Sequence, residues 1–246
     1  MYKRQPDSST QSSSQSTDKA DGGHSSNGSG TDNANGTGGV GGTDGADGDN
    51  QDTVTDNPLK IVESGWSADQ QGYVHYAFAL RNTSKTQQVQ YPQITITGRA
   101  KDGSIVFSQT QALNMAFPNQ TVYDAGQAGE GTAPETVDFT VLNPDTYNVA
   151  KAQGTAAFPI SGISKIDNRD GGTTFNGEVR AVADGFKPSD GQQIKISLVL
   201  RNAQNAIIYG DIAFVDWPGN GRSTPFSITV YDLPKYVSYD LYAQIW

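Results

Sequence analysis

The chain has 246 residues, a formal net charge of −9 at pH 7 and no cysteine. Without cysteine it has no disulfide framework, thiolate metal site or thiol nucleophile. The acidic balance argues against nucleic-acid binding and against electrostatic docking on anionic membranes, because both need a basic surface. The sequence also lacks a run of about 18 apolar residues, so nothing in it is predicted to span a membrane.

The first 57 residues are almost entirely Ser, Thr, Gly, Asp, Asn and Gln. Such a segment cannot bury enough apolar surface to offset the entropy of ordering it, so residues 1–57 are predicted to be a disordered, solvated stalk. The alternative is calcium binding by its aspartate run, which comprises Asp44, Asp47, Asp49 and Asp52. Thr55 stands where an EF-hand loop that starts at Asp44 needs its twelfth-position glutamate, so the spacer is favoured.

The opening five residues, MYKRQ, differ in character from the polar tract that follows. We therefore expect that this start is not the natural one and that a signal or lipid-anchor segment lies upstream. On that hypothesis the protein is extracellular, and it meets a membrane only through the anchor that this sequence lacks.

Residues 58–158 are predicted to form a first domain of short strands. The strands are expected at Leu59–Trp66, Tyr73–Arg81, Ile94–Phe107 (a hairpin), Thr136–Leu142 and Val149–Phe158. In the second of them, one face is apolar: Val74, Tyr76, Phe78 and Leu80. The stretch Ala125–Pro134, rich in Gly and Ala, is predicted to be a loop.

Residues 159–246 are predicted to form a second domain of the same kind. Its strands are expected at Ile160–Ile166, Phe175–Val182, Ile194–Tyr209 (a hairpin), Phe226–Val230 and Tyr239–Trp246. Phe175–Val182 is the expected counterpart of the strand at Tyr73, and Phe226–Val230 matches Val137–Val141 of the first domain.

The two hairpins carry the strongest evidence for a duplication. ITITGRAKDGSIVF at Ile94–Phe107 and IKISLVLRNAQNAIIY at Ile194–Tyr209 both alternate apolar residues around a Gly- or Asn-containing turn. Sliding one onto the other places Arg99 on Arg201 and Phe107 on Tyr209 without a gap. No segment of ten or more residues shows a capped helical period. The prediction is therefore an all-β chain of two tandem immunoglobulin-like β-sandwiches, stacked end to end with little linker.

At this point the sequence resembles the bacterial FxLYD-type immunoglobulin-like modules. The resemblance is carried by Arg81–Ser84 (RNTS), Ala100–Val106 (AKDGSIV) and Val137–Val141 (VDFTV). Leu198–Asn202 takes the place of the family's namesake pentapeptide, but its Phe, Tyr and Asp are all replaced; Ile96–Ala100 departs further. The resemblance implies a sandwich fold and a place on exported lipoproteins or membrane-anchored proteins of Gram-positive bacteria, and it implies no reaction.

The sequence offers little catalytic chemistry. Its two histidines are His24, in the polar tract, and His75, in mid-strand, where it is expected to face solvent or to pack against the neighbouring module. They cannot build a His-based zinc site or a Ser-His-Asp set. Paired carboxylates remain open as a weak alternative; the candidates are Glu63, Glu130, Glu135 and Glu178. We predict no enzyme activity, no cofactor and no metal.

Aromatic residues are the one binding signal. Trp66, Trp217 and Trp246 lie toward loops and strand ends. We expect these rings to cover the sandwich ends or the junction, but exposed rings are also how sugar-binding modules hold glycans. The predicted function is a non-catalytic cell-surface binding or structural protein whose partner is a protein or a cell-wall glycan component. The alternative is a carbohydrate-binding module that uses those tryptophans.

Overall fold

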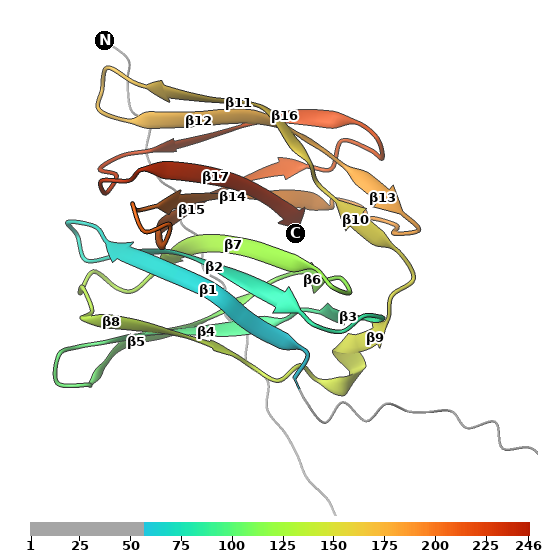
Figure 1. Cartoon of the computed structure of the whole chain (residues 1–246), viewed down its shortest axis with the longest axis horizontal. Helices are drawn as coiled ribbons and strands as arrows, with labels where there is room; N and C mark the ends of the chain where they lie inside the picture. The colour runs from blue at the N-terminus through green and yellow to red at the C-terminus, as the bar shows by residue number, and fades with distance from the viewer. Residues whose placement is uncertain (1–56) are drawn as a thin grey trace, which may run out of the picture. The chain divides into compact units, whose positions relative to one another are not determined.

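The computed structural model describes residues 57–246, which belong to one compact unit. The predicted stalk (apart from Asn57), the calcium alternative and His24 lie outside the described residues. We call β1–β9 the N-terminal half and β10–β17 the C-terminal half (Figure 1).

Strands make up nearly all of the regular structure in residues 57–246, which confirms the all-β prediction. The N-terminal half contains β1 (Leu59–Ala68), β2 (Val74–Asn82), β3 (Gln87–Gln90), β4 (Gln93–Arg99), β5 (Ile105–Ala112), β6 (Met115–Ala116), β7 (Thr121–Ala128), β8 (Thr136–Val141), the short 3₁₀ helix η1 (Thr146–Asn148) and β9 (Val149–Lys151). The C-terminal half contains β10 (Thr155–Ala157), β11 (Ile160–Asp167), β12 (Thr173–Arg180), β13 (Val182–Asp184), β14 (Gln193–Arg201), β15 (Ile207–Asp216), β16 (Ser223–Val230) and β17 (Ser238–Ile245).

Each half contains two three-stranded antiparallel sheets that follow the same order along the chain. The N-terminal half has β1-β2-β7 and β5-β4-β8, and the C-terminal half has β11-β12-β16 and β15-β14-β17. Small sheets complete the halves: β6-β3-β9 in the first and β10-β13 in the second. In both halves the chain therefore visits the same sheet positions in the same sequence, as a duplication requires.

The hairpin alignment holds at the level of single residue pairs. Arg99 pairs with Ile105 directly after a register shift, and Arg201 pairs with Ile207 directly after an equivalent shift. On either side of these shifts, Gly98 pairs with Phe107 and Leu200 with Tyr209. The register shift between the last two residues of β4 thus recurs at the aligned position of β14.

One predicted strand correspondence and one predicted loop are wrong. Phe226–Val230 lies in β16, which pairs with β12 as β7 pairs with β2, so the counterpart of β16 is β7. Val137–Val141 lies in β8, which pairs with β4 as β17 pairs with β14, so the counterpart of β8 is β17. The predicted loop at Ala125–Pro134 begins inside β7, where Ala125 to Ala128 pair with β2. Local alternation could not separate these cases, because β8, β16 and β17 have similar apolar spacing.

Two main hydrophobic cores fill the halves, and Met115 and Phe117 of the N-terminal half pack in the C-terminal core. Val74, Tyr76, Phe78 and Leu80 of β2 lie in the N-terminal core, as the alternation predicts. The C-terminal core is built on Phe175, Ile194, Ile196, Leu198 and Leu200, among others. Burial of these side chains, at about 25 cal/mol per Å² of apolar surface, is the main stabilising contribution in a chain without disulfides.

The halves meet through sheet faces, so the expectation of end-to-end stacking is wrong. The outer face of β1-β2-β7 packs on the outer face of β15-β14-β17 (Figure 1). Consequently the central strands β2 and β14 are buried on both faces along most of their length. The predicted domain limits at residues 58, 158 and 246 stay a prediction; β10, just before residue 158, pairs with β13 of the C-terminal half.

Candidate functional site

The junction between the halves is closely packed at its centre. Ala77 and Ala125 contact Val199 and Ile207 across it, and all four side chains are buried. Two glycines also allow the backbones to approach. A Cβ atom on Gly65 would lie 1.8 Å from the carbonyl oxygen of Ile207, and one on Gly210 would lie 2.3 Å from that of Tyr76. Neither position has room for a side chain.

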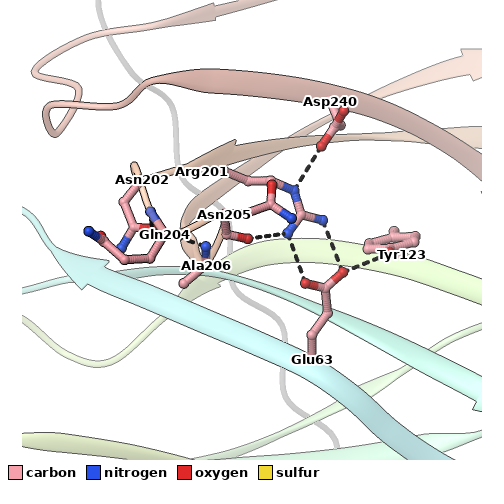
Figure 2. A network of polar contacts seen from close by, with 8 residues as sticks. All are labelled: Glu63, Tyr123, Arg201, Asn202, Gln204, Asn205, Ala206 and Asp240. Carbon is pink, nitrogen blue, oxygen red and sulfur yellow. Dashed lines mark hydrogen bonds and ion pairs between the residues drawn. The ribbon is translucent and has the colours of Figure 1, made fainter.

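Arg201 lies at the centre of a polar network that crosses the junction (Figure 2). Its Nη1 and Nη2 donate to the two carboxylate oxygens of Glu63 on β1, at 2.8 and 2.9 Å. Its Nε donates to Asp240 of β17 at 2.8 Å, and Nη1 also donates to the carbonyl oxygen of Asn205 at 3.0 Å. This two-pronged geometry is the strong form of the arginine–carboxylate pair.

The turn between β14 and β15 holds Arg201 in place. Asn202 Oδ1 accepts hydrogen bonds from the backbone N–H groups of Gln204 and Ala206, both at 3.0 Å, and Asn205 adopts the left-handed conformation with φ of +61°. Asparagine tolerates that conformation better than most residues. The residues of the predicted hairpin turn therefore also orient the guanidinium of Arg201, which forms an ion pair across the junction.

The ionisation of Glu63 is tied to this network. The hydrogen bonds from Arg201 lower its pKa, against an opposing effect of burial, and a 2.6 Å hydrogen bond from the Tyr123 hydroxyl lowers it further. For Tyr123 itself, burial and the hydrogen bond to Glu63 raise the pKa. Both oxygens of Glu63 are thus committed to partners, which leaves this carboxylate poorly suited to move a proton.

A second ion pair is buried nearby. Lys195 Nζ lies 2.6 Å from Asp124 Oδ1, and the amide of Gln244 donates to the same oxygen at 2.6 Å. Burial raises the pKa of Asp124, while Lys195 and Gln244 oppose that effect. The Lys195 ammonium also lies 4.5 Å from the ring centroid of Trp246. Removal of either charge would leave the other buried without compensation.

Aromatic pairs add to the contact between the halves. Tyr123 and Tyr242 stack with centroids 3.7 Å apart, and His75 stacks on Tyr209 at 4.7 Å with an interplanar angle of 14°. His75 therefore packs against the other half, which was one of its two predicted environments. Stacked pairs of this kind contribute about 0.5–1.5 kcal/mol beyond the area they bury.

A cleft of about 400 Å³ opens beside the His75–Tyr209 stack. Both halves line it: β1, the β1–β2 turn, β2 and β7 from one side, and β15, β16 and the segment after β16 from the other. The lining residues are Ser67, Ala68, Asp69, Gln70, Gln71, His75, Gln127, Tyr209, Asp211, Thr229, Val230, Tyr231, Asp232 and Pro234. Its volume is within the range of about 300–1,000 Å³ that is usual for small-ligand pockets.

The three predicted tryptophans are not gathered into one surface. Trp66 packs against the N-terminal core, Trp217 packs edge-on to Phe158 in the C-terminal core, and Trp246 covers Lys195 and contacts Phe214. All three are partly buried. Ligand binding by them stays a prediction.

The cleft residues were not singled out from the sequence as a site. They come from five separate segments that only the packing of the two halves brings together. The only indication of the cleft in the sequence is His75, which lies on the outward face of an amphipathic strand and is predicted to face solvent or to pack against the neighbouring module.

Within residues 57–246, no group of three or more His, Asp or Glu side chains is close enough to hold a metal ion. Over the same range, no helix has the length and apolar character needed to cross a membrane.

No known protein family and no curated protein matches the chain. Among solved structures, the crystal structure of the exo-chitosanase CsxA from Amycolatopsis orientalis is similar over 72% of this chain and 24% of that chain, at 12% sequence identity and a TM-score of 0.20. The chain thus spans about a quarter of that enzyme's length. A TM-score at this level carries no argument about function.

Proposed function

We propose that this is a non-catalytic binding protein of the Gram-positive cell surface, in which a rigid all-β unit presents the junction cleft to a protein or cell-wall component. The observation that carries the proposal is the interlocked junction. The two halves are joined by buried ion pairs and glycine-mediated backbone contacts, and this contact shapes a ligand-sized cleft. Surface location is part of the same proposal.

The chemistry of the junction favours binding over catalysis. Glu63, one of the four carboxylates considered for catalysis, is held by Arg201 and Tyr123. The cleft has its own carboxylates, but two of them, Asp69 and Asp211, accept hydrogen bonds from neighbouring backbone N–H groups. Such fixed groups can orient a ligand, and their affinity would come from surface complementarity.

The test is binding of the full chain to isolated Gram-positive cell walls, before and after protease treatment. Gln127 is exposed and lines the cleft, so Gln127→Trp should fill the cleft and abolish binding. Gln93→Trp is the matched control, because Gln93 is also exposed, lies at the start of β4 and does not line the cleft.

Binding that survives Gln127→Trp, or the absence of binding to any wall fraction, would contradict the proposal. Hydrolysis of a wall component that a single Glu→Gln substitution abolishes would show an enzyme instead. Quenching of tryptophan fluorescence by a glycan from a titration panel would instead support the alternative function, a carbohydrate-binding module.

A further inference from the structure

The junction cleft combines aromatic surface with uncompensated negative charge. His75 and Tyr209 form a stacked pair in the lining, and Tyr231, which is 55% exposed and donates its hydroxyl to Asp170 at 3.3 Å, also lines the cleft. The three charged acids of the lining are Asp69, Asp211 and Asp232. None of the lining residues is a lysine or arginine.

Two of the carboxylates have only neutral partners or a histidine. Asp211 accepts hydrogen bonds from the N–H of Ile212 at 2.7 Å and from the hydroxyl of Tyr209 at 3.2 Å. Asp69 accepts from two backbone N–H groups, and its second oxygen lies 3.4 Å from Nε2 of His75. Within residues 57–246, no lysine or arginine forms an ion pair with Asp69, Asp211 or Asp232.

This arrangement differs from that of the three ion-paired acids at the junction. Glu63 and Asp240 are paired with Arg201, and Asp124 is paired with Lys195. Negative charge therefore remains unpaired by lysine or arginine in the cleft that the two halves line. Low-dielectric walls of a cleft concentrate such a field and raise the local concentration of cations.

From these observations we infer that the cleft binds an organic ammonium group carried on a short apolar chain, such as a lysine side chain of a partner. The carboxylates of Asp211 and Asp232 receive the ammonium group, while the ring of Tyr231 provides a face for the cation and the adjoining methylenes. A volume of about 400 Å³ suits one extended side chain or a small amine and excludes a folded element. This inference rests on the proposed function, because it assigns a ligand class to the same cleft.

The probe is Nα-acetyl-lysine amide, compared with its neutral counterpart Nα-acetyl-norleucine amide, in a ¹H–¹⁵N NMR titration of the full chain. We expect the lysine probe to shift the backbone amides of Gln71, Gln127 and Ile212, with a response that weakens as the salt concentration rises. Butylammonium tests whether the ammonium group must belong to a peptide. If butylammonium shifts the same amides, a free amine is sufficient for binding. If only the lysine probe shifts them, the amide groups that flank the lysine side chain contribute to binding.

The variant Asp232→Asn should weaken binding of the lysine probe about fivefold, the loss of one partly exposed charge contact. Asp232 is exposed and has φ of +52°, a conformation that asparagine also tolerates, so the fold should be retained. Asp211→Asn should act in the same direction. Asp190→Asn, at an exposed position outside the lining, should leave binding unchanged.

Equal shifts from the norleucine probe, no shifts from the lysine probe, or shifts that Asp232→Asn leaves unaltered would overturn the inference. The proposed function fails separately. Wall binding that Gln127→Trp abolishes, together with a silent lysine titration, would keep the function and reject the ligand class.

Discussion

At the scale of single residues, the contact between the halves depends on charged side chains on the outer face of β14, a face that would ordinarily be exposed to water. Lys195 and Arg201 lie on the same face of β14 and are 2% and 5% exposed. Each is matched by an acid from the other half, Asp124 and Glu63. Buried pairs of this kind add little net stability over apolar residues, but they penalise any other partner or register.

The first prediction concerns Glu63. Glu63→Gln should lower the free energy of unfolding at neutral pH by about 2 kcal/mol, because Arg201 keeps Asp240 but loses its two-pronged partner, which is itself partly exposed. Chemical denaturation followed by circular dichroism measures it. Glu178→Gln, at an exposed position of β12, is the matched control and should change the unfolding free energy little.

The same substitution predicts a pH dependence. The folded-state pKa of Glu63 lies below its ordinary value of 4.5, so the unfolded state binds more protons as the solution is acidified. The stability from Glu63 is therefore complete above about pH 4.5 and is lost as the pH falls through the folded-state pKa. The difference in unfolding free energy between the parent and Glu63→Gln should shrink over that acidic range; a constant difference would contradict the assignment.

At the scale of strands and sheets, equivalent elements have different outer faces. Val199 of β14 packs in the junction, whereas its aligned counterpart Thr97 of β4 lies on the outer face of β5-β4-β8. Similarly, Ala77 of β2 is buried by the other half, while its counterpart strand β12 carries polar residues such as Asn176 on its outer face. The outer faces of β1-β2-β7 and β15-β14-β17 pack on each other because their residues are small and apolar. The polar outer faces of β5-β4-β8 and β11-β12-β16 stay on the surface, as the outer faces of capping repeats do in repeat proteins.

The second prediction tests this difference with aligned positions. Gly210 of β15 aligns with Ser108 of β5, which is exposed. Gly210→Val should destabilise the protein by about 3 kcal/mol or more, because its Cβ would meet the Tyr76 carbonyl oxygen at 2.3 Å. Ser108→Val should have an effect within about 0.5 kcal/mol. Thermal melting of both variants provides the comparison, and equal shifts would show that the two outer faces do not differ in packing.

At the scale of the whole described unit, the junction couples the two halves. It combines an apolar centre, two ion-paired clusters and two stacked aromatic pairs. Separation of the halves would expose the apolar groups and unpair the buried charges at the same time, so we expect the halves to unfold together.

The third prediction is that residues 57–246 unfold in a single transition. Trp66 reports on the N-terminal half, and Trp217 and Trp246 report on the C-terminal half. The fluorescence of the parent reports on both halves, and that of Trp66→Phe reports on the C-terminal half alone. In each of the two proteins, the denaturation midpoint from fluorescence should therefore equal the midpoint from circular dichroism. Calorimetric and van't Hoff enthalpies should also agree. Two separated midpoints would show independent halves.

The alternation of apolar residues in the sequence was enough to predict an all-β chain, most strands and the duplicated hairpin, because the period of a strand is a local property. It also placed Val74, Tyr76, Phe78 and Leu80 in a core. The cleft was beyond such reasoning: its lining comes from segments far apart in the chain, and sequence analysis pointed instead to Trp66, Trp217 and Trp246.

Only the tertiary structure decided which outer faces meet. On sequence alone, Lys195 and Arg201 have the spacing of solvent-facing residues on a half-buried strand, and Asp124 has no visible partner. Local periodicity says which face of a strand is apolar, but the burial of a charged face depends on a distant partner that supplies the opposite charge. That long-range pairing fixes the junction and, with it, the position and charge of the cleft.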